Sequence, residues 1–368
     1  MRYEKMTDRE RQVYKEITKN PYVSQQRLSE LLDLSRSTVA NLISSLVQKN
    51  ILLGRAYVLN DSRQVVCIGG ANVDRKFYSR DLKLKTSNPS QSSYTAGGVA
   101  RNIAENLGRL GLHSSLVTAA GRDADWSIIE SASSGVMNLD AVLQLPHAST
   151  GTYTAILDQE GDLFVALADM DVFEAIRPEL ILKNDRKLKH AECVIADLNC
   201  PKDSLELLIR KSRAYNTPLA FVTVSVPKMS RLPENLQGLT WLMTNVEETE
   251  AYFGCAIETR EDWEEAVLKW QRLGIEHVTM TSGDQGVLVG HPDGITFFPS
   301  PVIENIKDVT GAGDAFSSGV LYAWLESSSL EECIKAGLKN ASLCIQSNDT
   351  VRKDLTPQFL NEEMEEYI

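Results

Sequence analysis

Three short segments at the start of the chain carry apolar side chains at helical spacing. Residues 7–18 begin with Thr7 and Glu10, whose spacing is that of a helix-capping box. Residues 24–33 and 37–50 show the same helical spacing of apolar side chains. The pattern predicts three helices, each with one apolar face turned toward the other two.

Residues 51–59 follow these helices and read as two short strands around Gly54 and Arg55. Three helices and a hairpin are the elements of a winged helix-turn-helix, and the pattern resembles bacterial winged-helix regulators. In the third helix, the recognition helix, the outward N-terminal side chains suit phosphates and base edges: Ser35, Arg36, Ser37, Thr38 and Asn41. Arg55 would reach the DNA from the hairpin tip. We expect residues 1–60 to bind duplex DNA, with a helical cap or an oligomerisation module as the alternative.

A different pattern begins beyond residues 61–63, where apolar runs alternate with helical periods. Residues 65–70 read as a buried strand that ends in glycines, and residues 99–110 read as an amphipathic helix. Later apolar runs of strand length lie at 114–121, 191–199, 217–225, 239–245 and 277–283. Strands that alternate with helices predict an α/β fold with a doubly wound, mostly parallel sheet over residues 61–368.

Two segments interrupt this alternation. Residues 74–95 are polar and loop-rich, and residues 150–168 alternate like a hairpin with a turn near residues 159–162. A small β lid, formed near residues 74–95 and 150–170, would explain both segments. Lids of this kind exclude water from a site during group transfer.

The charge is unevenly distributed over the 368 residues, whose formal net charge is −12. Residues 1–60 contain ten Lys and Arg against six Asp and Glu, a net +4, which leaves −16 for residues 61–368. An acidic surface repels the phosphate backbone, so only the basic first sixty residues are a candidate for nucleic-acid binding.

The six cysteines have no CxxC spacing, and the five histidines are scattered. We therefore expect buried free thiols, and neither a zinc site nor a Ser-His nucleophile. The charged N-terminus lacks the apolar core of a signal peptide, and no run approaches 18 apolar residues. The expectation is a cytoplasmic protein without a membrane partner.

The strongest chemical motif is VTGAGDAF at residues 309–316, between a strand-like stretch at 301–308 and a helix at 315–326. Small residues before a helix leave N–H groups free to bind a phosphoryl group. A carboxylate at the helix start, Asp314, can take a proton from a bound hydroxyl. The alternative is an ordinary glycine-rich helix start in which Asp314 is only a cap.

This motif and four others resemble the ribokinase-like, phosphofructokinase-B type family of sugar and nucleoside kinases. The motifs occur in the order of the family and span residues 65–350: IGGANVD at 68–74, GGVARNIA at 97–104, TNVEE at 244–248, TSGDQG at 281–286 and DVTGAGDAF at 308–316. The resemblance implies a ribokinase-like α/β fold and ATP-dependent transfer of a phosphoryl group to a hydroxyl. It agrees with the absence of a GxxxxGK[ST] motif.

The resemblance also implies roles for individual residues. Asp314 would be the catalytic base, beside an anion hole formed by Gly311, Ala312 and Gly313. The substrate hydroxyls would be held by Asp74, Gly98 and Asn102. Each position has a structural alternative, since Asp74 could be a turn former and Gly98 only the start of a helix.

The nucleotide and its ions would be held by a second set of residues, again as the resemblance implies. Asn245 and Glu248 would organise Mg²⁺ and the phosphates, although both also suit an ordinary helix start. Asp308 and Thr310 lie where the family often binds a monovalent cation such as K⁺. The residues expected near ATP are Ser282, Gly283 and Asn340.

Several local runs resemble pseudouridine kinases in particular, at residues 87–89, 98–102, 168–171 and 196–199. Polar groups that could read a uracil edge as well as a ribose are Asn72, Asn88, Asp169 and Asn199. One departure is that residues 222–225 read VTVS, where many relatives have Asp-Pro. We expect phosphorylation of the pseudouridine 5′-hydroxyl, with ribose, another nucleoside or a hexose as alternatives.

A second hypothesis belongs to a different class of protein. The chain would be a transcription regulator whose kinase-like part only senses its ligand, although such a sensor would be free to lose Asp314. A two-fold dimer would suit half-sites one DNA turn apart, so a homodimer is a partner to be tested.

Overall fold

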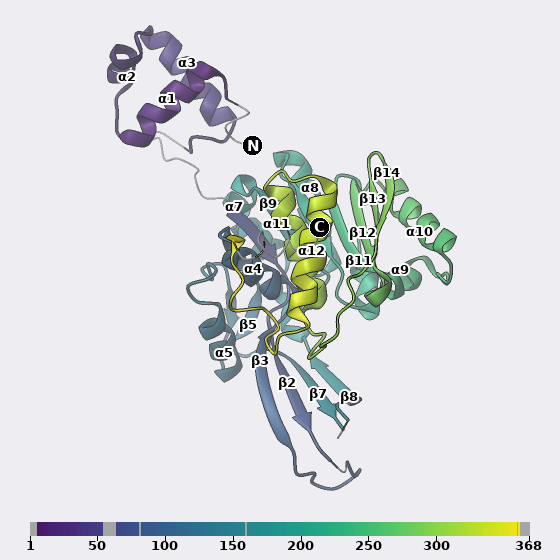
Figure 1. The fold of residues 1–368 in the computed structure, drawn as a ribbon. Helices are drawn as coiled ribbons and strands as arrows, with labels where there is room; N and C mark the ends of the chain where they lie inside the picture. Colours follow the sequence, from purple (N-terminus) through teal and green to yellow (C-terminus); the bar gives the residue numbers. More distant parts are fainter. Residues whose placement is uncertain (1–5, 54–63, 81, 159, 359, 361–368) are drawn as a thin grey trace. The chain divides into compact units, whose positions relative to one another are not determined.

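The structure is a computed structural model of the chain, and it describes residues 6–53, 64–80, 82–158, 160–358 and 360. The chain divides into two compact units, Met1–Arg63 and Gln64–Ile368 (Figure 1). Among the described residues, no helix is long and apolar enough to cross a bilayer. All six cysteines are free thiols, and five of them are buried.

The N-terminal unit contains the three predicted helices, α1 (Asp8–Lys19), α2 (Gln25–Leu32) and α3 (Arg36–Gln48). Thr7 and Glu10 form the expected capping box. The buried Glu10 carboxylate also accepts hydrogen bonds from Ser45 Oγ at 2.6 Å and Lys49 Nζ at 2.7 Å, which ties α1 to the end of α3. The predicted hairpin tip, with Gly54 and Arg55, lies outside the described residues.

The larger unit is built on an eight-stranded sheet in the order β14-β13-β12-β11-β10-β9-β1-β4. Its strands are β1 (Gln64–Ile68), β4 (His113–Val117), β9 (Cys193–Asp197), β10 (Leu219–Val222), β11 (Trp241–Asn245), β12 (His277–Thr281), β13 (Val287–His291) and β14 (Gly294–Phe298). All neighbouring pairs are parallel except those that involve β13 and β14. The mostly parallel sheet predicted from the sequence is confirmed.

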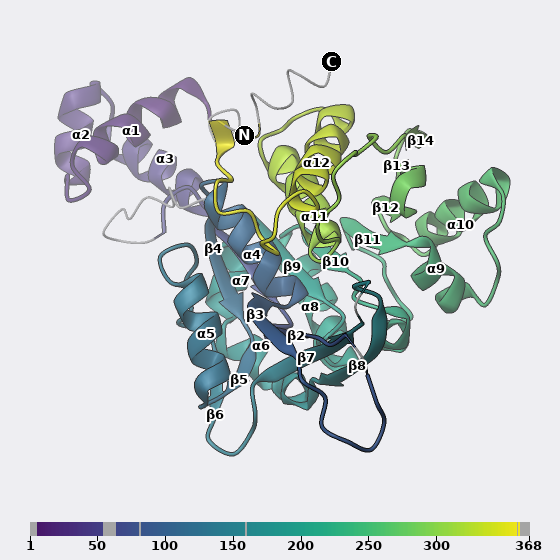
Figure 2. The ribbon, with the colours of Figure 1, turned by 60° about the horizontal axis from the view of Figure 1, so that its bottom comes forward.

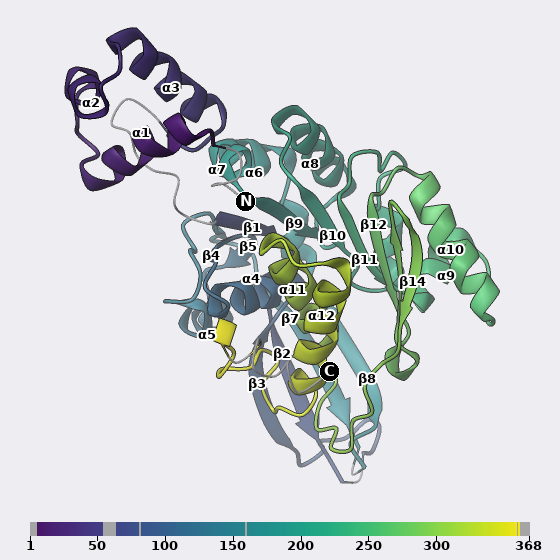
Figure 3. The same ribbon diagram turned by 45° about the horizontal axis from the view of Figure 1, so that its top comes forward.

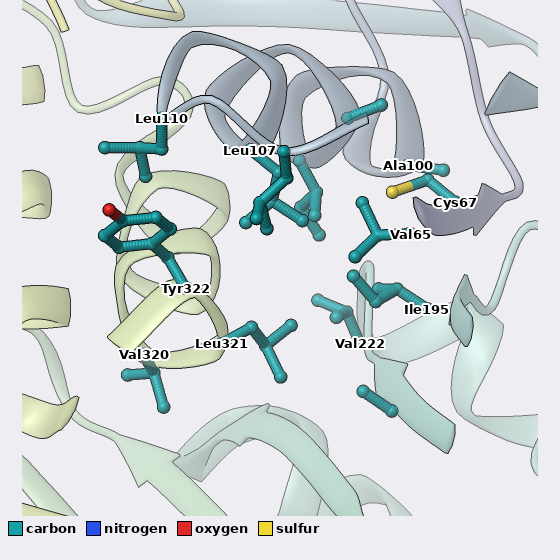
Figure 4. Packing of buried hydrophobic residues seen from close by; sticks show 14 of the residues in the cluster. Val65, Cys67, Ala100, Leu107, Leu110, Ile195, Val222, Val320, Leu321 and Tyr322 are labelled. Carbon is teal, nitrogen blue, oxygen red and sulfur yellow. The ribbon is translucent and has the colours of Figure 1, made fainter. Parts of the chain in front are cut away.

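Helices cover both faces of this sheet (Figure 2, Figure 3). One core contains side chains of α4 (Val99–Arg109), α5 (Ala124–Ser133), α11 (Ala312–Leu325) and α12 (Leu330–Cys344). The other contains side chains of α6 (Pro178–Lys183), α7 (Asp185–His190), α8 (Lys202–Tyr215), α9 (Val246–Phe253) and α10 (Arg260–Arg272). Strand β1 contributes side chains to both cores. Val65 and Cys67 point toward α4 and α11 (Figure 4), whereas Val66 and Ile68 lie in the core on the other face of the sheet.

A four-stranded sheet in the order β3-β2-β7-β8 projects from the main sheet (Figure 1, Figure 3). Its strands are β2 (Asn72–Tyr78), β3 (Gln91–Gly97), β7 (Gly151–Leu157) and β8 (Leu163–Asp169). The hairpin expected at residues 150–168 is present as the antiparallel pair β7 and β8. Residues 74–95 are more regular than predicted, because β2 pairs with β3 over seven residues and only the segment between them is loop. We call these four strands the lid sheet.

The strand expected at residues 301–308 is absent, so that expectation was wrong. Val302 is 96% exposed and Ile306 is 60% exposed, so these apolar side chains have no sheet to pack on. The segment is instead held by the N–H groups of Lys307 and Asp308, which donate to the carbonyl of Ile345 at the end of α12. Two short strands, β5 (Ala119–Gly121) and β6 (Leu143–Leu145), and the short helices η1 (Asp171–Ala175), η2 (Val226–Arg231) and η3 (Gly283–Gln285) complete the unit.

Candidate active site

The N-terminus of α11 faces open space. Gly311 precedes the helix with φ +83°, and a Cβ there would lie 2.4 Å from the carbonyl oxygen of Thr350, so this position requires glycine. The N–H groups of Gly313 and Asp314 lie in the first helical turn, where helix geometry supplies no acceptor. No heavy atom lies within 4 Å of the position a Cβ on Gly313 would take. The turn can therefore receive an anionic group.

Asp314 is the third residue of α11, and its side chain is buried. Its Oδ2 accepts a hydrogen bond of 2.7 Å from Asn102 Nδ2 on α4. Burial raises the pKa of Asp314 to about 7, the Asn102 bond opposes this, and the charges of Asp197 and Asp74 add to the rise. A carboxyl group with this pKa is suited to take a proton at neutral pH.

Arg101, which sequence reasoning did not single out, fixes the orientation of Asn102. Its Nη1 donates to Asn102 Oδ1 at 3.0 Å and to the carbonyl of Ala96 at 3.2 Å. Because the amide oxygen is held by the guanidinium, the amide N–H₂ points at Asp314. Arg101 is itself buried and forms an ion pair with Glu105 one turn along α4. The sequence contained one signal for this role, an arginine directly before Asn102 within the motif at 97–104.

Strand β2 brings Asn72 and Asp74 to the same face, and Asn72 Nδ2 donates to Asp74 Oδ1 at 2.7 Å. Burial raises the pKa of Asp74 to about 6, although the Asn72 bond and the charges of Lys76 and Arg101 oppose it. On the neighbouring strand β3, a Cβ on Gly97 would lie 2.1 Å from Asp74 Oδ2. The absence of a side chain at Gly97 therefore leaves room for the Asp74 carboxylate.

Gly98 begins α4 with φ +101°, and a Cβ there would lie 2.5 Å from the carbonyl oxygen of Gly70. Asp197, at the end of β9, joins the same two segments because its Oδ2 accepts the N–H groups of Gly70 and Ala100, both at 2.9 Å. Burial raises the pKa of Asp197 against these bonds. Asp197 thus holds the turn after β1 against the start of α4.

Asp308 and Thr310 lie together just before α11. Thr310 donates to Asp308 Oδ1 through its N–H at 3.0 Å and its hydroxyl at 2.6 Å. Lys76 of β2, which sequence reasoning missed, donates to Asp308 Oδ2 and to Thr310 Oγ1. Burial would raise the pKa of Asp308, but the bonds from Lys76 and Thr310 outweigh it and hold the pKa below its usual value.

Asn245 and Glu248 form a capping box at the start of α9. Asn245 Oδ1 accepts the N–H of Glu248 at 2.8 Å, and Glu248 Oε2 accepts the N–H of Asn245 at 3.1 Å. The same carboxylate accepts a hydrogen bond from Thr223, which follows β10. Thr223 belongs to the VTVS segment at residues 222–225, where many relatives have Asp-Pro. Burial raises the pKa of Glu248 in spite of these bonds. The described residues contain no cluster of three or more His, Cys, Asp or Glu that could hold a metal ion.

Ser282 and Gly283 follow β12 at the same edge of the sheet as Asn245, which ends β11 opposite Thr281. Gly283 has φ +49° and open space beside its Cα. Asn340 lies on α12 and contacts α11. Its side chain is buried, and its Nδ2 donates to the carbonyl of Ala315 at 2.9 Å. This contact ties α12 to α11 through Nδ2, whereas the buried Oδ1 of Asn340 has no hydrogen-bond partner among the described residues.

Asn88 and Asp169 belong to the lid sheet and its loop, and neither forms a hydrogen bond with another predicted site residue in the described part of the chain. Asn88 folds the loop between β2 and β3, because its Oδ1 accepts the N–H of Lys83 at 2.7 Å and its Nδ2 donates to the Lys83 carbonyl at 2.9 Å. Asp169 is exposed at the end of β8 and lines an open groove between β6, η1 and α6. Neither Asp74 nor Asp314 lines that groove.

Comparison with known proteins assigns the larger unit to a family. Residues 62–356 match the pfkB family carbohydrate kinase profile. The chain belongs to the pfkB family of carbohydrate kinases. Kinases of this family use ATP and transfer a phosphoryl group to an alcohol. In the N-terminal unit, residues 6–52 match a second family, described as winged helix-turn-helix DNA-binding.

Two known relatives can be aligned with most of this chain. The pseudouridine kinase of Escherichia coli strain K12 is 29% identical over 300 residues, which cover 81% of this chain and 95% of that protein. An uncharacterized sugar kinase of the same organism is 29% identical over 342 residues, which cover 92% and 93%. These relatives support a sugar or nucleoside kinase.

Solved structures show the same fold. A carbohydrate kinase from Agrobacterium tumefaciens superposes with a TM-score of 0.71 at 27% identity, over 82% of this chain and 97% of that one. The ribokinase of Arabidopsis thaliana, solved with ribose and ATP, gives a TM-score of 0.73 at 21% identity, over 82% and 98%. The ribokinase-like fold expected from the motifs is confirmed.

Proposed function

We propose that this pfkB-family kinase transfers the γ-phosphoryl group of ATP to the 5′-hydroxyl of pseudouridine. The observation that carries the proposal is the buried carboxyl group of Asp314, with a pKa of about 7, at the open N-terminus of α11. A base, an anion site and a set of hydroxyl-binding side chains meet at this one point, and phosphoryl transfer requires little more than such positioning.

In the proposed reaction, Asp314 accepts the proton of the attacking hydroxyl while Asn102 holds the carboxylate in place. The N–H groups of Gly311 and Gly313 receive the negative charge that develops on the phosphoryl oxygens. The N–H of Ala312, the third member of the expected anion hole, instead donates to the carbonyl of Val309 at 3.2 Å. Asp74 binds substrate hydroxyls from the lid sheet. The residues supply orientation and a preformed anion site, and the lid sheet excludes water.

The nucleotide would lie along the carboxyl edge of the main sheet, where ligands bind in open α/β folds. Ser282 and Gly283 fit there because Gly283 leaves its Cα side open. Asn245 and Glu248 fit Mg²⁺, because one carboxylate with water and phosphate oxygens is a common ligand set for this ion. Bound Mg²⁺ would neutralise charge on the phosphates.

The choice of pseudouridine rests on the Escherichia coli relative and on the local runs shared with pseudouridine kinases. Asn72 is buried beside Asp74, and in this proposal it contacts the ribosyl group. Asn88 and Asp169 form no hydrogen bond with Asn72 or Asp74 in the described part of the chain, although Asp169 lies opposite Thr152, the neighbour of Val73 on β2. Ribose and other nucleosides are therefore the comparisons that decide the substrate.

The test is an ATP-consumption screen with the full chain over nucleosides and sugars. We expect pseudouridine to give the highest kcat/KM, with uridine and ribose clearly lower. Uridine differs from pseudouridine only in the attachment of the base, so it is the matched control for base recognition. A clear preference for uridine or ribose would overturn the choice of pseudouridine and leave the family assignment standing.

A second function is supported by the N-terminal unit. The start of α3 exposes Arg36, Ser37, Thr38 and Asn41, the positions expected to meet DNA. Ser35 serves as the helix N-cap and accepts the N–H of Thr38 at 3.0 Å, so its hydroxyl has a structural role. We propose that residues 1–60 bind duplex DNA. A pure ligand sensor is disfavoured, because such a protein needs no base at Asp314.

A further inference from the structure

Lys76 occupies an unexpected position beside the anion site. It lies on β2 two residues beyond Asp74, so both side chains leave the same face of the lid sheet. Its Nζ donates to Oδ2 of Asp308, a residue 232 positions later in the sequence, and to Thr310 Oγ1 at 3.3 Å. Only 22% of the Lys76 side chain and 33% of the Asp308 side chain are exposed.

Asp308 and Thr310 are the residues at which the family resemblance implies a monovalent cation, and the structure allows that implication to be tested. Asp308 Oδ1 already accepts both the N–H and the hydroxyl of Thr310. Asp308 Oδ2 and Thr310 Oγ1 are both bonded to the Lys76 ammonium group. A K⁺ ion at these oxygens would have to displace the ammonium or lie beside it against like-charge repulsion. The residues present do not fit a bound K⁺.

We propose that the Lys76 ammonium group takes the place of the monovalent cation, so that phosphoryl transfer by this kinase does not depend on K⁺. The ammonium group is a compact single charge with three donors, and it satisfies the side-chain oxygens that would otherwise coordinate an ion. The inference rests on the proposed kinase activity but not on the identity of the substrate.

The replacement has a mechanical consequence. A free ion would bind the segment before α11 without a covalent link to the lid sheet, whereas Lys76 belongs to β2, the strand that also carries Asp74. The same strand therefore holds the substrate-binding carboxylate and braces the loop that leads to Gly311. Placement of the lid strand and of the anion site is linked through one ion pair.

The test compares K⁺ with tetramethylammonium, which is too large for such a site, at matched ionic strength. We expect wild-type turnover to be equal in the two salts. Lys76→Met should lower kcat by about tenfold or more, because charge stabilisation beside the anion site is lost. Added K⁺ should restore part of that loss in Lys76→Met. Lys85→Met, at an exposed lysine in the loop between β2 and β3, is the control and should behave as wild type.

Thermal unfolding gives a readout that does not depend on activity. K⁺ should raise the Tm of Lys76→Met and leave that of wild type unchanged relative to tetramethylammonium, because only the variant gains an ion site. Wild-type turnover that rises several-fold with K⁺, or a K⁺-specific rise in wild-type Tm, would overturn the inference without requiring a variant. If no sugar or nucleoside is phosphorylated in either salt, the proposed function fails, and the Tm comparison still decides the cation question.

Discussion

At the residue scale, three carboxylates of the site differ because their neighbours differ. Asp314 is buried and Asp74 is half-buried, and each receives one hydrogen bond from a neutral asparagine amide. Burial outweighs that bond in both cases, so both pKa values rise. Asp308 receives an ammonium group and two bonds from Thr310, and its pKa falls. The environment therefore separates carboxyl groups that can exchange a proton near neutral pH from one that stays ionised.

The pH dependence of kcat/KM follows from this difference. Asp314 must be ionised to accept a proton, so kcat/KM should rise with pH and level off above the pKa of about 7. Asn102→Leu removes the bond that favours the ionised form and should move this limb to higher pH, as well as raise KM. Steady-state rates across pH measure both effects. A limb near the ordinary aspartate value of about 4 would contradict the assignment.

At the scale of elements, the start of α4 depends on Gly98. Gly98→Ala would place a Cβ 2.5 Å from the Gly70 carbonyl oxygen at a φ of +101°, which combines backbone strain with a clash. We expect a loss of about 2 kcal/mol or more in the free energy of unfolding, together with lower turnover.

Gly135→Ala is the matched control for that prediction. Gly135 also has a positive φ, +82°, but no heavy atom lies within 4 Å of the position that the new methyl group would take, so only backbone strain applies. Urea unfolding should therefore show a smaller loss of stability for Gly135→Ala than for Gly98→Ala. Equal destabilisation by the two substitutions would show that the contact between α4 and the turn after β1 contributes nothing.

Elements with local signals were predictable. The capping box of Thr7 and Glu10, the helix at residues 99–110 and the lid hairpin each have their defining residues within a few positions. The segment at 301–308 was misjudged, because apolar residues at 302, 303 and 306 form a strand only when a sheet edge is available to pair with it.

Pairings across long stretches of chain were not predictable from spacing. The motifs named Asn102 and Asp314 separately, but their hydrogen bond joins residues 212 positions apart. Lys76 and Thr223 carry no local signal, since their roles come from Asp308 and Glu248 on other elements. The role of Asn340 stays a prediction, because an asparagine on a helix has the same sequence pattern whether it faces a ligand or the core.

At the scale of the whole molecule, charge divides the chain. Residues 1–60 carry +4 in a chain whose total is −12, so DNA binding by the full chain should rest on a few contacts and be sensitive to salt. Arg36→Ala should weaken duplex binding and reduce the dependence of log Kd on log salt by about one contact. Fluorescence anisotropy over a salt series measures both quantities.

Arg272→Ala, at an exposed arginine of α10 in the kinase unit, is the control and should leave DNA binding unchanged. A duplex from the protein's own promoter region is the appropriate probe. If the full chain shows no binding at low salt, or if the two variants bind equally well, the N-terminal unit acts as a cap or an oligomerisation module instead.

The most direct measurement is the turnover of Asp314→Asn beside Asp262→Asn, which changes the same residue type at the same third position of another helix, α10. The folded-state pKa of Asp314, about 7, lies above its unfolded value. The folded chain therefore loses stability as pH rises and Asp314 ionises. At pH 8 the asparagine variant should be no less stable than the wild type. We predict that Asp314→Asn binds ATP but loses kcat by ~10²-fold or more, while Asp262→Asn keeps it. Near-normal turnover of Asp314→Asn would contradict the account.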